Sequence, residues 1–448
     1  MSTAVESLTI AEFGRRLRAG EISSREITDA CLRRIEADNP RLNAFILVLG
    51  EDARRQAREA DAELAAGHDR GPLHGVPISL KDLLDVRGFP TTAASRVRAG
   101  HVAGSDAPAV ANLRQAGAVL VGKTNLHEFA FGTTSEDSAF GPARNPHDPT
   151  RSPGGSSGGS AASIVAGMAL ASVGTDTGGS IRIPAAACGT VGLKPTYGEV
   201  PAEGVVPLSR TLDHVGPLTR SVEDAWIVYR ALMGAPARTL APRPAEGLKV
   251  AVLRPYFCDL LDDEVRARFE DALARLRDAG ARIDEAEIHH SADIASIYLH
   301  LSFADAAAYH ATTLERSPEL YTTPVRLRLE MARYVQAEDY VRALRGREVL
   351  RREVDAALAG RDALVLPALA IPAPTIGAAA TRIAGREEPV RSVMLRLTQL
   401  FNLTGHPAIS IPCGSTAAGL PCALQLVGAR DATEALLRTS LACEPHVG

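Results

Sequence analysis

A stretch rich in glycine, serine and threonine between residues 151 and 204 restricts the fold of this chain more than any other feature. It contains two glycine-serine loops, GGSSGGSAA at 154–162 and GTDTGGSIRIPAAACG at 174–189. Such a composition is also typical of flexible linkers. However, the segment AASIVAGMALASVG at 161–174 indicates a buried helix of small residues that leads into a strand. We therefore predict that both loops belong to a packed core.

These loops also indicate a class of chemistry. Glycines beside a serine allow a substrate to approach the backbone closely, and they leave successive N–H groups free to face a developing negative charge. This arrangement suits acyl transfer. A phosphate-binding loop would need G-x-x-x-x-G-K-[ST], or G-x-G-x-x-G at the start of a helix, and neither pattern occurs in these two loops. The loops therefore favour an acyl-transfer site over nucleotide binding.

Short apolar runs and predicted helices alternate along the rest of the chain. The runs include VPISL at 76–80, AVLVG at 118–122 and AISIPCG at 408–414, and a capping box of Ser23 and Glu26 begins an early helix. Strands that alternate with helices indicate a parallel, buried sheet. We therefore predict an α/β fold with a large, mixed, mostly parallel central sheet sandwiched between helices. The chain is expected to form one unit over 1–448, with an N-terminal helical flank (1–70), a core (74–224), a variable helical region (235–360) and a C-terminal return to the sheet (361–448).

Composition argues against several classes of partner. The formal net charge is −4 without a basic block, so the chain offers no electrostatic footprint to a nucleic acid. No stretch approaches the roughly 20 apolar residues that span a bilayer, and the first residues show no basic region followed by an apolar run. The six cysteines form no CxxC pair, and the twelve histidines form no cluster with zinc-ligand spacing. We expect a cytoplasmic protein without a membrane anchor, a metal or another cofactor.

Lysine usage singles out a candidate base. Only four of the 49 lysine and arginine residues are lysine, and Lys81, Lys123 and Lys194 fall in the region between 75 and 196. Arginine cannot lose its proton in a protein, whereas burial can lower the pKa of a lysine until it acts as a base. Chance retention of a few lysines is the alternative explanation. We interpret Lys81 as the candidate base and the other two as structural.

A second assignment of the chemistry stays open at this point. Gly154, Ser156 and Gly158 fit the G-x-S-x-G pattern of α/β-hydrolases, in which Ser156 would be the nucleophile. Such an enzyme needs an acid and a histidine later in the chain, and Asp213 and His406 are candidates. In a stretch so rich in glycine, this pattern also arises easily by chance.

Several longer strings resemble the amidase signature family. They are GVPISLKD at 75–82, NLHEFAFGTTSEDSAFGPARNP at 125–146, GGSSGGSAA at 154–162, GTDTGGSIRIPAAACGTVGLKPTYG at 174–198, LDHVGPLTRSVED at 212–224 and, near the end, NLTGHPAISIPCG and GLPCALQLVG. The resemblance covers nearly the whole chain and is weakest between 235 and 360. It implies the amidase signature fold and hydrolysis of a carboxamide C–N bond.

The resemblance assigns catalytic roles by position. Lys81 matches the base of the family, Ser156 its bridging serine and Ser180 its nucleophile, and a cis peptide bond is expected between Gly155 and Ser156. In this scheme the proton of Ser180 passes through Ser156 to a neutral Lys81, whose pKa would be lowered by burial. No histidine is then required for catalysis.

Supporting residues are expected around these three. The turn before Ser180 would stabilise the oxyanion through backbone N–H groups, and a charge-assisted hydrogen bond would brace that turn. The residues concerned are Thr177, Gly178 and Gly179 for the oxyanion hole, Asp176 and Arg182 for the brace, Ser157 near Lys81, and Phe131, Thr133 and Thr134 as candidate lining of the substrate pocket.

The implied substrate is a small linear amide, with an anilide, ester or carbamate as further candidates. The products would be a carboxylic acid and an amine or ammonia. Arg144, Arg151 and Arg210 are the candidates for a carboxylate clamp. A scaffold without activity is not expected, because all three catalytic candidates are present.

The alternative function within the family is the A subunit of glutamyl-tRNA(Gln) or aspartyl-tRNA(Asn) amidotransferase, which releases ammonia from glutamine for a partner protein. Members of that branch resemble one another in an SSNLARYDG-like stretch. The corresponding residues here are IYLHLSFADAAAYHATTL. We therefore expect a stand-alone amidase, either a monomer or a homodimer.

Overall fold

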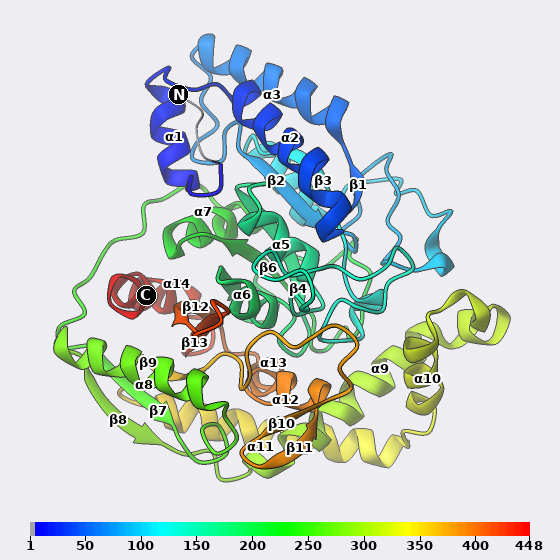
Figure 1. Ribbon diagram of the computed structural model, residues 1–448, viewed down its shortest axis with the longest axis vertical. Helices are drawn as coiled ribbons and strands as arrows, with labels where there is room; N and C mark the ends of the chain where they lie inside the picture. The colour runs from blue at the N-terminus through cyan, green and yellow to red at the C-terminus, as the bar shows by residue number, and fades with distance from the viewer. Residues whose placement is uncertain (1–4) are drawn as a thin grey trace.

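Strands from nearly the whole length of the chain meet in one sheet. The computed structural model describes residues 5–448, and within them eleven strands form this sheet and two more form a separate hairpin (Figure 1). The strands of the sheet are β1 Phe45–Val48, β2 Pro77–Lys81, β3 Val119–Thr124, β4 Ala171–Asp176, β5 Val191–Lys194, β6 His214–Thr219, β7 Lys249–Leu253, β8 Arg282–Ala286, β9 Ala363–Pro367, β12 Ala408–Ser415 and β13 Pro421–Val427, and the hairpin consists of β10 Ala380–Ile383 and β11 Arg386–Pro389.

The order of the strands explains how the sheet is mixed. It runs β1-β3-β2-β4-β6-β5-β12-β13-β9-β7-β8. Neighbours are parallel within β3-β2-β4 and within β9-β7-β8, and antiparallel elsewhere in the sheet. The predicted large mixed α/β sheet is confirmed. Its antiparallel share is larger than expected, because consecutive strands such as β12 and β13 are joined by a turn and not by a crossover helix.

Helices flank the sheet and account for most of the remaining chain (Figure 1). Residues 5–448 contain no helix with the length and apolar content that a membrane span requires. The helices are α1 Ile10–Arg18, α2 Ser24–Leu42, α3 Gly50–Ala65, α4 Pro108–Gln115, α5 Gly158–Val165, α6 Arg182–Cys188, α7 Val222–Leu232, α8 Asp263–Asp278, α9 Ile294–Arg316, α10 Thr323–Ala332, α11 Ala337–Leu358, α12 Val390–Leu395, α13 Gln399–Thr404 and α14 Thr433–Val447.

The start of α2 forms as its sequence predicts. The Ser23 hydroxyl accepts the backbone N–H of Glu26 at 3.1 Å, and the Glu26 carboxylate accepts the backbone N–H of Ser23 at 2.8 Å. This reciprocal capping box satisfies two backbone donors that the first turn of a helix leaves free. The small-residue segment at 161–174 likewise forms the end of α5 and the start of β4, so both glycine-serine loops lie in the core.

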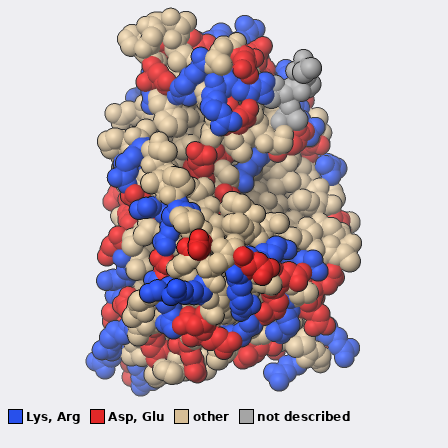
Figure 2. All heavy atoms as spheres, turned by 90° about the vertical axis from the view of Figure 1, so that its left-hand side faces the viewer, with Lys and Arg blue, Asp and Glu red and all other residues tan. Residues whose placement is uncertain are grey.

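The positive charge of the surface is carried almost entirely by arginine. On the face drawn in Figure 2, positive and negative side chains are interspersed without a field of one sign. Lys81, Lys123 and Lys194 are completely buried, and only Lys249 is exposed. The lysines that the sequence singled out therefore belong to the interior.

Candidate active site

Lys81 lies at the centre of the site, as the last residue of β2 between β3 and β4. Its side chain is completely buried, and Nζ donates hydrogen bonds to Ser156 Oγ at 2.8 Å and to Thr175 Oγ1 at 2.7 Å. Burial lowers the pKa of Lys81 to about 7, against the opposing effect of the Asp176 and Asp213 charges. A large fraction of the amine is therefore neutral near pH 7, as a proton acceptor must be.

Ser156 is presented by a loop that is fixed through its backbone. The loop precedes α5, and the expected cis peptide bond between Gly155 and Ser156 is present. The Ser156 carbonyl accepts the backbone N–H of His127 and the hydroxyl of Ser135, each at 3.2 Å. A Cβ added to Gly155 would lie 2.8 Å from the backbone nitrogen of Ser135, so only glycine fits there. The Ser156 hydroxyl is left to contact Lys81.

Ser180 occupies the turn between β4 and α6, beside the first loop. The backbone N–H of Ser157 donates to the Ser180 carbonyl at 3.2 Å, and Ser157 Oγ donates to the Thr175 carbonyl at 3.2 Å. Ser157 thus holds Thr175, the residue whose hydroxyl accepts a hydrogen bond from Lys81. Ser180 is 6% exposed, whereas Lys81 and Ser156 are completely buried. Of the three candidate catalytic side chains, Ser180 is the one that a substrate can reach.

The turn that carries Ser180 offers backbone donors, with one difference from the prediction. In the part of the chain that the structure describes, the N–H groups of Thr177, Gly178 and Ser180 have no hydrogen-bond partner. The N–H of Gly179 instead donates to Asp176 Oδ1 at 2.7 Å, and the φ of +137° at this position favours glycine. Gly179 therefore shapes the turn, and the other three N–H groups are left to face an oxyanion.

A buried ion pair lies behind the turn. Arg182 Nη2 is 2.9 Å from Asp176 Oδ1, and both side chains are completely buried. The Asp176 carboxylate also accepts the backbone N–H of Ile181 at 3.1 Å. Burial alone would raise the pKa of Asp176, but the Arg182 guanidinium holds it well below its usual range. The expected charge-assisted brace is therefore present.

Three polar residues that the sequence did not indicate complete this brace. Asn402 Nδ2 donates to the carboxylate of the ion pair at 2.8 Å, and the guanidinium donates to Gln425 Oε1 at 2.5 Å. Thr398 Oγ1 donates to the Gly178 carbonyl at 2.6 Å. The bonded residues are separated by 220 to 243 positions in the sequence. Only the order of the strands brings them together, so no local pattern could have found them.

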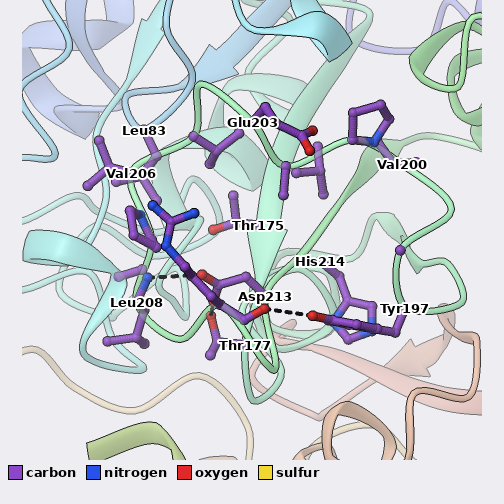
Figure 3. Close-up of a pocket in the computed structure, with 18 residues that line it drawn as sticks. Leu83, Thr175, Thr177, Tyr197, Val200, Glu203, Val206, Leu208, Asp213 and His214 are labelled. Carbon is purple, nitrogen blue, oxygen red and sulfur yellow. Dashed lines mark hydrogen bonds between the residues drawn. The ribbon is translucent and has the colours of Figure 1, made fainter. Parts of the chain in front are cut away.

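A cavity of about 270 Å³ opens beside this turn (Figure 3). Thr175 and Thr177 line it together with Tyr197, Leu208 and Asp213. The Asp213 carboxylate accepts the Thr177 hydroxyl at 2.6 Å and the Leu208 N–H at 3.0 Å. Burial raises the pKa of Asp213 to about 6. The sequence singled out Asp213 only as the acid of a histidine triad, whereas here it anchors a residue of the oxyanion turn.

The predicted pocket-lining residues share one segment. Phe131 is buried and packs edge-on against Phe303 of α9, with 5.2 Å between ring centroids. Thr133 is buried, and the Thr134 carbonyl accepts the Ser152 hydroxyl at 2.7 Å. This segment leads directly into the residues that hold the Ser156 loop. A role for its side chains in substrate binding stays a prediction.

The serine-histidine triad is not formed. His406 Nε2 lies 2.9 Å from Asp355 Oδ1, and His406 Nδ1 lies 2.9 Å from Thr404 Oγ1. The side chains of Asp213 and Ser156 bond to other residues of the site. The histidine is therefore already occupied by partners that have no part in the site.

Lys123 and Lys194 differ from Lys81 in their surroundings. Lys123 forms a completely buried ion pair with Asp82, with 2.8 Å between Nζ and Oδ1. Lys194 donates to the His406 carbonyl at 2.6 Å. These contacts agree with the interpretation of both residues as structural.

Comparison with known proteins agrees with this arrangement. A family model described as Amidase matches residues 26–437. The chain belongs to the amidase signature family. An amidase of Pseudomonas putida is 40% identical over an alignment that covers 99% of this chain and 96% of that protein.

Other relatives within the amidase signature family differ in their described roles. The A subunit of the glutamyl-tRNA(Gln) amidotransferase of Roseiflexus sp. (strain RS-1) is 39% identical over 97% of this chain and 96% of its own length. A crystal structure described as that of an amidase matches with a TM-score of 0.93 and 38% identity, over 98% of this chain and 100% of that chain. The predicted family, fold and class of enzyme are thereby confirmed: this protein is an amidase. The individual roles of Lys81, Ser156 and Ser180 stay predictions.

Proposed function

We propose that this amidase hydrolyses a small linear carboxamide through an acyl-enzyme on Ser180, with Lys81 as the base and Ser156 as the proton relay. The observation that carries the proposal is the completely buried Lys81 amine, which lies 2.8 Å from the Ser156 hydroxyl. A serine hydroxyl is a weak nucleophile until a neighbouring base takes its proton. An amine with a pKa of about 7 can do this near neutral pH.

Acylation starts with the substrate carbonyl oxygen facing the N–H groups of Thr177, Gly178 and Ser180. The neutral amine of Lys81 takes the hydroxyl proton of Ser156, which takes the proton of Ser180 in the same step. The Ser180 oxygen attacks the carbonyl carbon, and the carbonyl oxygen becomes an oxyanion. Loss of one oxyanion donor typically lowers the rate by about 10² to 10³.

Breakdown uses the same path in reverse. The proton returns from Lys81 through Ser156 to the substrate nitrogen, the C–N bond breaks, and the amine or ammonia leaves. A water molecule then gives a proton to the relay and attacks the acyl carbon. Collapse of this second intermediate returns the proton to Ser180 and releases the carboxylic acid. No cofactor is required by these steps.

The proposal is tested by three substitutions and one trapping experiment. We expect Ser180→Ala to abolish amide hydrolysis, and Ser156→Ala and Lys81→Ala to leave only traces. Intact-protein mass spectrometry with a slowly deacylating ester should show one acyl group on the wild type and none on Ser180→Ala. Lys249→Ala is the matched control, because Lys249 is exposed and distant in sequence from the site. Near-normal turnover of an activated amide by Lys81→Ala would show that the base is assigned wrongly.

A second candidate function is that of an amidotransferase A subunit. It is supported by the 39% identity to the Roseiflexus protein over 97% of this chain. The deciding measurements are ammonia release from glutamine by the purified chain and a search for a bound partner by pull-down. Strong glutaminase activity that depends on a partner would favour this function over a stand-alone amidase.

We also propose that residues 1–448 act as one amidase unit, as a monomer or a homodimer in the cytoplasm. The proposal is supported by the sheet, whose strands come from positions 45 to 427 of the chain. Size-exclusion chromatography with light scattering distinguishes the two oligomeric states.

A further inference from the structure

One cation near the site has no counter-ion. Arg391, the second residue of α12, is half-buried, and it forms no ion pair or hydrogen bond with any residue between 5 and 448. Burial lowers the pKa of its guanidinium to about 10, and the groups that act on it electrostatically are Tyr298 and Arg328. Neither of these is a carboxylate. A cation that is partly removed from water without an anion is unfavourable, so an anionic ligand would stabilise it.

The neighbouring acid is already used. Asp137 Oδ2 lies 3.0 Å from His127 Nε2 and 3.5 Å from Arg328 Nη2. Arg328 also donates to the Phe131 carbonyl at 2.9 Å. One carboxylate therefore serves a histidine and the adjacent arginine, and none is left for Arg391.

The surroundings of Arg391 connect it to the catalytic turn. Its Cζ lies 5.7 Å from the centroid of the Phe131 ring, and Phe131 packs against Phe303. Tyr298 of α9 packs against the oxyanion turn so closely that a Cβ added to Gly178 would overlap its hydroxyl. We call Phe131, Tyr298, Phe303 and Arg391 the Arg391 cluster. It places a half-buried cation and aromatic rings, of which Phe303 is partly exposed, next to the backbone donors of the turn.

The arginines that the sequence offered as clamps are less suitable. Arg144 donates to the Pro149 carbonyl at 2.8 Å, and Arg151 donates to the Ala373 carbonyl at 2.7 Å. Arg210 lines the cavity of Figure 3, but it is exposed to solvent. Unlike Arg144 and Arg151, Arg391 has all of its donors unused.

We propose that Arg391 binds a carboxylate of the substrate, so that this amidase prefers amides with an anionic group several bonds away from the scissile C–N bond. This inference rests on the proposed function. A guanidinium can bind a carboxylate through two parallel hydrogen bonds, which fixes both position and orientation. The rings of Phe131 and Phe303 would contact the apolar part of the substrate between the two groups. The carboxylate can belong to the acyl part or to the amine part.

Two matched pairs of amides distinguish a carboxylate on the acyl part from one on the amine part. On the acyl side, the 4-nitroanilides of succinate and butyrate differ in one terminal carboxylate. On the amine side, butyryl anilides with and without a para carboxylate differ in the same way. We expect the wild type to have a higher kcat/KM for the anionic member of one pair. Arg391→Met should lower that preference by about 10- to 100-fold, the range for a hydrogen bond to a charged group.

Two further variants guard against misfolding and non-specific effects. Arg391→Lys keeps the positive charge but cannot form two parallel hydrogen bonds, and it should retain part of the preference for the anionic amide. Arg396→Met, at the end of the same helix, should retain all of it, because that guanidinium lies over Tyr256, 3.7 Å from the ring centroid. Equal kcat/KM within both pairs for the wild type, or an unchanged preference in Arg391→Met, overturns the proposal.

Binding measurements keep this inference separate from the proposed mechanism. Isothermal titration of Ser180→Ala with the same four amides requires no turnover. Tighter binding of an anionic member to Ser180→Ala, lost in Ser180→Ala/Arg391→Met, supports the carboxylate site. Failure of the wild type to hydrolyse any of these amides rejects the proposed function for them, but it leaves that binding result standing. Equal binding of both members of each pair rejects the site.

Discussion

At the scale of single residues, the pKa of Lys81 sets the pH range of activity. Lys81 must be neutral to accept a proton, and it becomes protonated below its pKa of about 7. We therefore expect kcat/KM for a neutral amide to fall about tenfold per pH unit below this value. The measurement is a pH–rate profile between pH 5 and 9. A profile that stays flat down to pH 5.5 would argue against a lysine base.

The charge of Asp213 is expected to tune this profile. Its negative charge raises the pKa of Lys81, so Asp213→Asn should move the acid limb of the profile to lower pH. The same change weakens the anchor of Thr177, and kcat should fall by roughly 5- to 100-fold. Asp305→Asn is the matched control, because Asp305 bonds to Ser209 Oγ at 2.6 Å and does not act on the lysine. An unshifted acid limb in Asp213→Asn would contradict the electrostatic coupling.

The candidate site was predictable where its residues stand in recognisable strings. Lys81, Ser156 and Ser180 lie within GVPISLKD and the two glycine-serine loops. Thr175, which holds the lysine amine, lies in the second loop but has no feature that distinguishes it from its neighbours. Arg391 could not be found at all, because what sets it apart is the lack of a partner, and that is a property of tertiary packing.

At the scale of elements, the contact between α9 and the turn after β4 should limit what residue 178 can be. Gly178→Ala places a methyl group against the ring and hydroxyl of Tyr298, so the turn must shift. Its backbone N–H groups then no longer point at the oxyanion. We expect kcat/KM to fall by about 10² to 10³. Gly178→Ala/Tyr298→Leu should recover part of this loss by making room. Normal kinetics in Gly178→Ala would mean that the turn does not form the oxyanion hole.

Elements with strong local signals were predicted, and those defined by packing were not. The capping box of α2 and the apolar runs of β2 and β3 carry enough information in a few residues. The 23-residue helix α9 was assigned only to a variable helical region. Its buried residues follow one face from Ile294 to Leu314, where it packs against α10, α11 and α13. However, apolar residues such as Leu299 and Tyr309 also lie on its exposed faces, so the sequence shows no single apolar stripe. The hairpin of β10 and β11 lacks a hydrophobic pattern because most of its residues are exposed.

At the scale of the whole molecule, one arginine attaches the N-terminal flank to the rest of the chain. Arg220, just before α7, donates to the carbonyls of Glu6 at 2.9 Å, Leu8 at 3.2 Å and Leu170 at 3.3 Å. We expect Arg220→Met to lower the free energy of unfolding by about 3 kcal/mol, because several carbonyls, most of them partly buried, lose a charged donor. Urea denaturation followed by circular dichroism measures this change.

The control for this prediction is Arg55→Met. Arg55 lies on α3 in the same flank, and its side chain is 51% exposed beside Asp52 and Glu59. An exposed ion pair contributes little, so the expected change is below about 1 kcal/mol. Equal effects of the two substitutions would show that Arg220 does not fasten the flank.

The strand order also belongs to this scale, and it was the least predictable part of the fold. Alternating strands and helices led to the expectation of a mostly parallel sheet, and the parallel runs β3-β2-β4 and β9-β7-β8 agree with it. Between these runs, β5 and β6 are joined by a loop and β12 and β13 by a turn, and the pairing of β5 with β12 depends on contacts between distant segments. Sequence periodicity carries no information about such pairing.

The distribution of lysine has a practical consequence. Three of the four lysine amines are sealed inside the folded protein, and Lys249 is the one that reagents in solution can meet. Among the lysines, amine-directed dyes, cross-linkers and resins should therefore attach to the native enzyme at that position. Since Lys249 starts a strand far along the sheet from β2, the enzyme can be tethered through it while catalysis continues.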